Sequence, residues 1–204
     1  MVGQPGDKCD IYVVNANGSG TPKRLVTQPT DCLSMSISTW SPDGNNIAGQ
    51  VSNQMDVSQI YVFNVSGRED KDQPLKLTEG PGSNSAPSWS PDGTEIAFTH
   101  TPDRKHCLGP NANYPEKYCY ASGVPAVYKM NADGSEVTRL THSPDIDFSP
   151  TWSPDGKKLA FVRKYSVGKS GIYKSGIYTM NSDGSDLTLL RKFVATNTVH
   201  SVDW

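Results

Sequence analysis

Long apolar runs, helical periodicity and an excess of one charge are all missing from this sequence. Of its 204 residues, 19 are Lys or Arg and 21 are Asp or Glu, which gives a net charge of -2. Because no basic run breaks this balance, binding to nucleic acid is not expected. The longest apolar stretches are about six residues, whereas a membrane-spanning helix needs roughly 20, so membrane insertion is not expected either. Residues 1–6 lack the charged and apolar regions of a secretory signal.

Catalytic signatures are also missing. The chain contains no Gly-x-Ser-x-Gly elbow, no His-Glu-x-x-His and no phosphate-binding loop. His100, His142 and His200 fall in or beside expected strand ends, but nothing in the sequence indicates that they converge. We therefore predict no catalytic residue and no cofactor.

What the sequence has in quantity is turn-forming and aromatic residues. It contains 18 Gly, 15 Pro, nine Tyr and four Trp. Many turns between aromatic and β-branched runs are typical of an all-β protein.

The sequence repeats itself, and the repeat defines the fold. Ser88-Trp-Ser-Pro-Asp-Gly-Thr-Glu-Ile-Ala-Phe98 recurs from Thr151 to Phe161 and from Thr39 to Gly49. A second motif, Ile177-Tyr-Thr-Met-Asn-Ser-Asp-Gly-Ser185, recurs from Val127 and Ile11 and, shortened, from Ile60. A short strand such as Thr138-Arg-Leu-Thr follows each copy. Each unit therefore predicts four short strands, with Ser-Pro-Asp-Gly and Asn-x-Asp-Gly-Ser as tight turns.

The tryptophans mark the period of the repeat. Trp40, Trp89, Trp152 and Trp204 are separated by 49, 63 and 52 residues. Four-stranded units at this period are typical of β-propeller blades. We expect the four tryptophans, the Ile-Tyr pairs, Phe98 and Phe161 to form the repeated core.

These composite motifs resemble the TolB-like (PD40/WD40-like) β-propeller repeat, and similar repeats occur in the propellers of prolyl oligopeptidase-like peptidases. The resemblance covers nearly the whole chain apart from the loops. It implies one propeller domain over 1–204 and, for function, protein–protein contacts in the cell envelope. A peptidase would need a further hydrolase domain. The fold does not itself define the function, because propellers host many activities.

Counting strands gives three complete blades, at 34–78, 86–140 and 148–190, and a fourth that is split. Its third and fourth strands lie near 10–27 and its first strand at 199–204, so 15 of 16 strands are expected. The resemblance implies rings of six blades. Three alternatives remain open: a fragment of a longer propeller, a small propeller closed by its two ends, or a partial propeller completed by another copy in a dimer or filament.

Four cysteines permit three pairings, and strand order favours one. Cys9 precedes a third strand and Cys32 follows the fourth strand paired with it, while Cys107 and Cys119 bracket one loop. We predict the disulfides Cys9–Cys32 and Cys107–Cys119, and with them an extracytoplasmic (periplasmic, cell-surface or secreted) location. Reduced thiols are the alternative, and no Cys-x-x-Cys spacing supports zinc.

Propeller geometry sorts the connections into two faces. The Ser-Pro-Asp-Gly and Asn-x-Asp-Gly-Ser turns share one face, and the opposite face receives longer connections at 27–36, 52–58, 79–86, 101–125, 141–148, 164–176 and 191–198. The insertion 101–125 carries His106, Tyr114, Tyr118 and Tyr120. Tyrosine-rich loops on a rigid scaffold suit recognition of a protein or glycan.

Two polar patterns could hold a cation. His142, Asp145 and Asp147 lie together in one connection, where the alternative is a set of solvated turn residues. The Asn-x-Asp-Gly-Ser turns lack the acidic twelfth residue of a calcium loop. We predict no metal site.

The sequence thus favours a non-catalytic propeller module that binds a protein or glycan through its long-loop face, or that forms a homo-oligomer or polymer. A carbohydrate-active enzyme on the propeller is the alternative, and it would need carboxylates about 5–10 Å apart at the ring centre. A structural filament subunit is the second alternative.

Overall fold

The computed structural model describes residues 11–26, 32–53, 57–65, 73–103, 106–108, 118–120, 123–167, 172–193 and 201–204. Regular structure in these ranges is β-strand throughout. No helix in them is long and apolar enough to cross a membrane.

Three four-stranded antiparallel sheets form the body of the molecule, and we call them the first, second and third blades. The first blade contains β3 (Ser34–Trp40), β4 (Asn46–Ser52), β5 (Ser58–Asn64) and β6 (Leu75–Lys76). The second contains β7 (Ser83–Trp89), β8 (Glu95–Thr101), β11 (Ala126–Asn131) and β12 (Thr138–Arg139). The third contains β13 (Ile146–Trp152), β14 (Lys158–Val167), β15 (Ile172–Asn181) and β16 (Thr188–Phe193).

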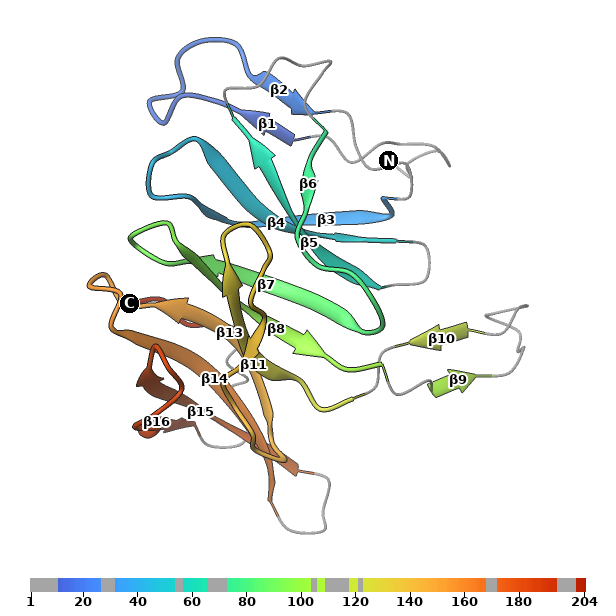
Figure 1. Ribbon diagram of the computed structural model, residues 1–204, viewed down its shortest axis with the longest axis vertical. Helices are drawn as coiled ribbons and strands as arrows, with labels where there is room; N and C mark the ends of the chain where they lie inside the picture. Colours follow the sequence, from blue (N-terminus) through green and yellow to red (C-terminus); the bar gives the residue numbers. More distant parts are fainter. Residues whose placement is uncertain are drawn as a thin grey trace.

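Each blade is a meander in which strands pair in chain order. The blades follow one another from top to bottom of Figure 1, after a two-stranded sheet of β1 (Ile11–Val13) and β2 (Lys23–Val26). The predicted all-β propeller of four-stranded antiparallel blades is confirmed, with boundaries within three residues of those expected.

The core lies between the blades rather than inside them. One buried cluster joins Ala48, Ile60 and Leu77 of the first blade to Phe98 and other residues of the second. A second cluster joins the second blade to the third, and a third cluster joins β1 and β2 to the first blade. This packing follows from the strand pattern, because the alternating side chains of each sheet need an apolar face on either side.

The Ser-Pro-Asp-Gly turns are built identically in the three blades. In the second blade the Ser90 hydroxyl donates to Asp92 Oδ1 at 2.6 Å, and Asp92 Oδ1 accepts the Thr94 N–H at 3.0 Å. The first and third blades repeat these bonds at Ser41–Asp43 and Ser153–Asp155. The hydroxyl bond, followed by the backbone bond, lowers the pKa of each aspartate.

The tryptophans do not all belong to the core, so that expectation is wrong at two positions. Trp152 is 6% exposed, but Trp40 and Trp204 are 48% and 50% exposed. The indole of Trp152 packs against the blade before it and donates from Nε1 to the Ser88 carbonyl at 3.1 Å. Trp40 follows the β1–β2 sheet, and no described strand lies where such an acceptor would be.

Residues 201–204 carry the last repeat of the tryptophan. The Trp204 Nε1 donates to the carbonyl of Thr151 at 3.1 Å. Trp152 makes the corresponding bond to Ser88, one blade earlier. These residues form no strand ladder, and 199 and 200 of the expected strand lie outside the described residues. The indole contact nevertheless places this segment at the inner-strand position beside the third blade.

The connection expected at 164–176 is mostly strand. β14 and β15 continue as a hairpin to Val167 and from Ile172, with Tyr165 opposite Lys174. Tyr165, Val167 and Ile172 are strong strand formers, so the ladder extends beyond the blade. The β16 strand likewise runs to Phe193, into the connection expected at 191–198.

Candidate functional site

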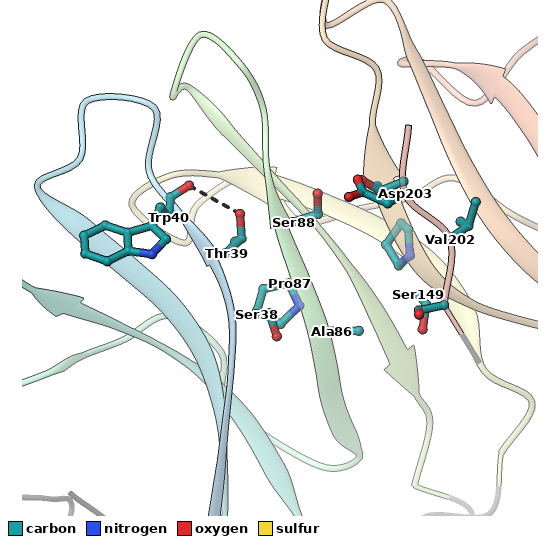
Figure 2. Close-up of a pocket in the computed structure, with 12 residues that line it drawn as sticks. Ser38, Thr39, Trp40, Ala86, Pro87, Ser88, Ser149, Val202 and Asp203 are labelled. Atoms are coloured by element: carbon teal, nitrogen blue, oxygen red, sulfur yellow. Dashed lines mark hydrogen bonds between the residues drawn. The ribbon is translucent and has the colours of Figure 1, made fainter. Parts of the chain in front are cut away.

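A cavity of about 480 Å³ lies at the centre of the blades. Three inner strands and the C-terminal segment line it, and Figure 2 shows residues from all four. The lining residues are Ser38, Thr39, Trp40, Ala86, Pro87, Ser88, Ser149, Pro150, Thr151, Ser201, Val202 and Asp203.

Strained backbone shapes this cavity. Ala86 and Ser149 have φ values of 48° and 52°, and each lies where the ladder of an inner strand shifts register. The N–H of Ala86 donates to Gln50 Oε1 at 3.1 Å, and that of Ser149 donates to Thr99 Oγ1 at 3.0 Å. Bonds to the preceding blade therefore hold the bulges in place.

The chemistry of the cavity is that of hydroxyl groups. Among the described residues that line it, Asp203 is the only charged one and none is a histidine. Such a surface can hydrogen-bond a neutral polar group. The described lining residues do not include the pair of carboxylates that glycoside hydrolysis uses, nor a base beside any of these serines.

The described residues of the insertion 101–125 include a two-stranded hairpin. It consists of β9 (His106–Leu108) and β10 (Tyr118–Tyr120), whose register places Tyr120 opposite His106 and Cys119 opposite Cys107. Figure 1 shows this hairpin standing out from the blades. Tyr114 lies outside the described residues, and only the backbone of the two hairpin strands is described.

The base of the insertion is closed by a backbone bond. The N–H of Gly123 donates to the Pro102 carbonyl at 2.9 Å. The strands on either side, β8 and β11, pair directly with one another. The blade is therefore complete without the hairpin.

Cys32 lies against the cluster between β1–β2 and the first blade and is disulfide-bonded. Its partner is not among the residues whose side chains are described, and Cys9 lies outside the described residues.

His142, Asp145 and Asp147 are not brought together as one group. His142 is exposed, and Asp145 accepts a bond from the Ser143 hydroxyl at 3.1 Å. Asp147 is 1% exposed and receives two bonds from Arg163, at 2.6 Å and 2.9 Å. It is therefore a buried ion-pair partner rather than a solvated turn residue. Within the described ranges, no three His, Cys, Asp or Glu residues are placed to hold a metal ion.

Arg163 lies in an aromatic setting. Its guanidinium carbon is 4.8 Å from the Tyr178 ring centre and 5.6 Å from that of Phe161. The hydrogen bonds to Asp147 raise the pKa of Arg163 despite its burial. Burial raises the pKa of Tyr178. These directions keep Arg163 positively charged and Tyr178 neutral at neutral pH.

A second polar cluster, which the sequence analysis missed, lies between the first and second blades. Its members are His100, Asn84, Gln59 and Thr78, and the last three are buried. His100 Nδ1 is 2.9 Å from Asn84 Oδ1. A signal was available, because Asn84 lies five residues before its tryptophan and is paired across the strand with His100, as Asp147 is with Arg163.

No family model matches the chain, but comparison with known proteins finds both TolB proteins and an enzyme among its relatives. A Tol-Pal system protein TolB from Alcanivorax borkumensis is 45% identical over 49 residues, which is 24% of this chain and 11% of the relative. Acylamino-acid-releasing enzyme 1 from Oryza sativa subsp. japonica is 26% identical over 92% of this chain and 23% of its own length.

Solved structures cover more of the chain. A TolB-type protein from Agrobacterium tumefaciens superposes with a TM-score of 0.68 at 26% identity, over 96% of this chain and 61% of that one. TolB from Acinetobacter baumannii gives a TM-score of 0.59 at 25% identity, over 89% and 37%. The chain thus spans less than two thirds of the length of each of these relatives.

The neighbours include enzymes as well as TolB, so the fold alone does not decide whether this chain is catalytic. The repeat motifs, the blades and these similarities agree on the architecture. The chain is a TolB-like β-propeller.

Proposed function

We propose that this protein is a non-catalytic interaction module whose projecting hairpin, β9–β10, binds a protein partner. The observation that carries the proposal is the hairpin itself, which stands out from a blade that is complete without it (Figure 1). A loop on a rigid scaffold is a frequent place for recognition. The sequence of β10 contains Tyr118 and Tyr120, and tyrosine is a residue type that gives amphipathic contact area at low cost in side-chain entropy.

The similarity to a Tol-Pal system protein supports an assembly role. The central cavity supports a non-catalytic role, because the described residues of its lining offer hydroxyl groups and one carboxylate. A carbohydrate-active enzyme remains the alternative, and a glycan that bound at the central cavity and was cleaved there would favour it.

Site-specific photo-crosslinking tests the proposal directly. A benzophenone amino acid is placed at Tyr118 in cells that make the protein, and at Lys157 as the matched control. Lys157 is exposed in a Ser-Pro-Asp-Gly turn, at the other edge of the blades. We expect a protein adduct from position 118 and none from position 157. Equal adducts from the two positions would contradict the proposal.

Excision of the hairpin gives the second arm. Residues 104–122 are removed and Asp103 is joined to Gly123, whose N–H already bonds Pro102 at the base. We expect a midpoint of thermal unfolding within about 3 °C of the parent, since the blade keeps its ladder. Binding of the crosslinked partner should be lost. Binding retained by this folded variant would overturn the assignment.

We further propose an extracytoplasmic location with the disulfides Cys9–Cys32 and Cys107–Cys119. Cys32 is disulfide-bonded, and the register places Cys107 directly opposite Cys119. Disulfides persist in oxidising compartments. Peptide mapping without reduction should recover these two pairs, and any other pairing or free thiols would contradict the assignment.

Self-association is a second candidate function, favoured by the exposed edge of the first blade. Leu33, Ile37 and Trp40 are 62%, 41% and 48% exposed on or beside β3. Light scattering should give a mass above the 22.1 kDa of one chain, and Trp40→Ser should reduce it to one chain. A monomer at all concentrations would remove this candidate.

A further inference from the structure

A second cavity, of about 340 Å³, lies between the first and second blades. Leu77 and Thr78 of the first blade line one side of it, and Phe98, His100 and Tyr128 of the second blade line the other. Val137 and Glu79 lie at its exposed rim. The cavity is within the range of small-molecule sites, and its walls are mainly apolar.

A chain of hydrogen bonds fixes the polar groups of this cavity. The Thr78 hydroxyl accepts the N–H of Ile60 at 2.9 Å and donates to Gln59 Oε1 at 2.6 Å. Gln59 Oε1 also accepts from Asn84 Nδ2 at 2.9 Å, and Gln59 Nε2 donates to the Gly82 carbonyl at 3.2 Å. The orientation of both amides is therefore set by their partners.

This network selects one tautomer of His100. Because Asn84 uses its amide nitrogen on Gln59, its oxygen is the acceptor, and His100 Nδ1 must donate. Burial, and then the charge of Arg139, lower the pKa of His100, which favours the neutral ring. Its Nε2 then carries a lone pair, and no residue among those described hydrogen-bonds to that atom. Within the part of the chain that the structure describes, the cavity thus offers an acceptor that no protein donor uses.

The next interface along the chain shows what kind of group this position accommodates. There the equivalent of His100 is Arg163, whose planar guanidinium lies over the Tyr178 ring at 4.8 Å. The equivalent ring at the cavity is Tyr128, which His100 meets edge-on with 5.0 Å between centroids. A planar donor over the tyrosine is therefore compatible with the repeat.

Charge decides against a cation in the cavity. Arg163 is compensated by Asp147, whereas the equivalent of Asp147 is the neutral Asn84. Glu79 is 79% exposed and lies 3.8 Å from Lys76, and the positive charge of Arg139 acts on His100. A desolvated cation would have no buried counter-charge, so a neutral ligand is favoured.

We propose that this cavity binds a neutral aromatic group with an O–H or N–H donor, a phenol or an indole. The donor bonds Nε2 of His100, and the ring packs between Leu77 and the Phe98–Tyr128 pair. The group could belong to a free small molecule or to a Tyr or Trp side chain of a partner, since the chemistry is shared.

The test is a titration of the full chain, labelled with ¹⁵N in its histidines, with phenol and with anisole. Anisole has the same ring without the donor. We expect phenol to shift the His100 Nε2 resonance saturably and to bind about tenfold more tightly than anisole. Equal binding of the two, or no saturable shift with phenol, would overturn the proposal.

Variants keep the test independent of folding. His100→Phe should weaken phenol binding about tenfold, while His142→Phe, at an exposed position, should leave it unchanged. Val137→Trp should block the rim while His100 keeps its tautomer, as the unliganded ¹⁵N shifts would show. Phenol binding that survives both His100→Phe and Val137→Trp would place the ligand elsewhere.

N-Acetyl-tyrosinamide distinguishes the sources. Competition with phenol at similar affinity would show that a partner's side chain can enter, whereas phenol binding alone would indicate a free small molecule. Excision of residues 104–122 should leave phenol binding unchanged, so failure of the hairpin proposal and failure of this one are distinguishable.

Discussion

The two interfaces between complete blades use one scaffold and different chemistry. At the same cross-strand position the second blade carries Asn84 opposite His100 and the third carries Asp147 opposite Arg163. The first blade has the apolar pair Met35 and Val51 there. The apolar residues around this position repeat, so the identity of one cross-strand pair decides whether an interface is sealed by an ion pair or retains a cavity beside a neutral polar pair.

The largest effect is expected from Asp147→Asn, which preserves the shape of the side chain and removes the counter-charge of Arg163. Arg163 is 9% exposed, so its charge would remain buried without compensation. We expect a loss of about 3–5 kcal/mol in the free energy of unfolding, measured by denaturant titration at pH 7. Asp145→Asn, two residues away and partly exposed, should cost less than about 1 kcal/mol. Equal losses of stability in the two variants would mean that the buried ion pair contributes no more to stability than a partly exposed carboxylate does.

Gln59→Leu tests the first interface in the same way. It removes the acceptor of both the Thr78 hydroxyl and Asn84 Nδ2, which are buried. We expect a loss of about 1–3 kcal/mol in the free energy of unfolding. It is smaller than at Asp147 because the groups left without an acceptor are neutral. Asn64→Ala, exposed in the same strand, is the matched control. An unchanged His100 tautomer by ¹⁵N shifts would show that Asn84 is oriented by something other than Gln59.

Replacing the polar residues of the first interface by those of the second tests whether the two interfaces are equivalent. The triple variant Gln59→Ala, Asn84→Asp and His100→Arg reproduces the residues of the second interface, where Ala126 is the equivalent of Gln59. We expect stability within about 2 kcal/mol of the parent, and phenol binding should be lost because the guanidinium replaces the acceptor.

His100→Arg alone should be less stable than the triple variant, since its charge would have no partner. A double-mutant cycle of Asn84→Asp and His100→Arg should give a coupling energy of about 0.5–3 kcal/mol between the two substitutions. Additive single effects would mean that the two interfaces are not equivalent in geometry.

The blade framework could be predicted from sequence because it rests on local chemistry. Ser-Pro-Asp-Gly and Asn-x-Asp-Gly-Ser carry their own hydrogen bonds, and the glycines at 93 and 134 have the positive φ values that these turns need. Trp40 and Trp204 were assigned wrongly because their burial depends on a neighbouring blade, which is a property of the assembly and not of the motif.

The candidate sites could be predicted only in part, for a related reason. The insertion 101–125 was visible as an interruption of the repeat, but a loop was predicted there and not the short strands β9 and β10. The pairs at His100 and Arg163 were hidden because each joins residues 16 positions apart across a strand ladder. Only alignment of the repeats with one another would have identified these positions, where the cross-strand pair differs between blades while the surrounding apolar residues repeat.

The smallest expected effect lies in the turns, where the blades do not differ. Asp43, Asp92 and Asp155 each have a pKa lowered by the bond from a serine hydroxyl. A lowered pKa in the folded state contributes stability above the unfolded value of 3.8, and that contribution is lost as the pH falls through the folded pKa.

The three turns therefore predict equal behaviour, in contrast to the interfaces. Each of Asp43→Asn, Asp92→Asn and Asp155→Asn should lower the midpoint of thermal unfolding at pH 7 by roughly 1–3 °C, since these carboxylates are exposed and screened by solvent. The difference from the parent should shrink below about pH 3.8 and disappear once the parent's carboxylates are protonated. Calorimetry across this pH range measures it. If one substitution behaved differently from the other two, the position of a blade in the propeller would affect its turns as well as its interfaces.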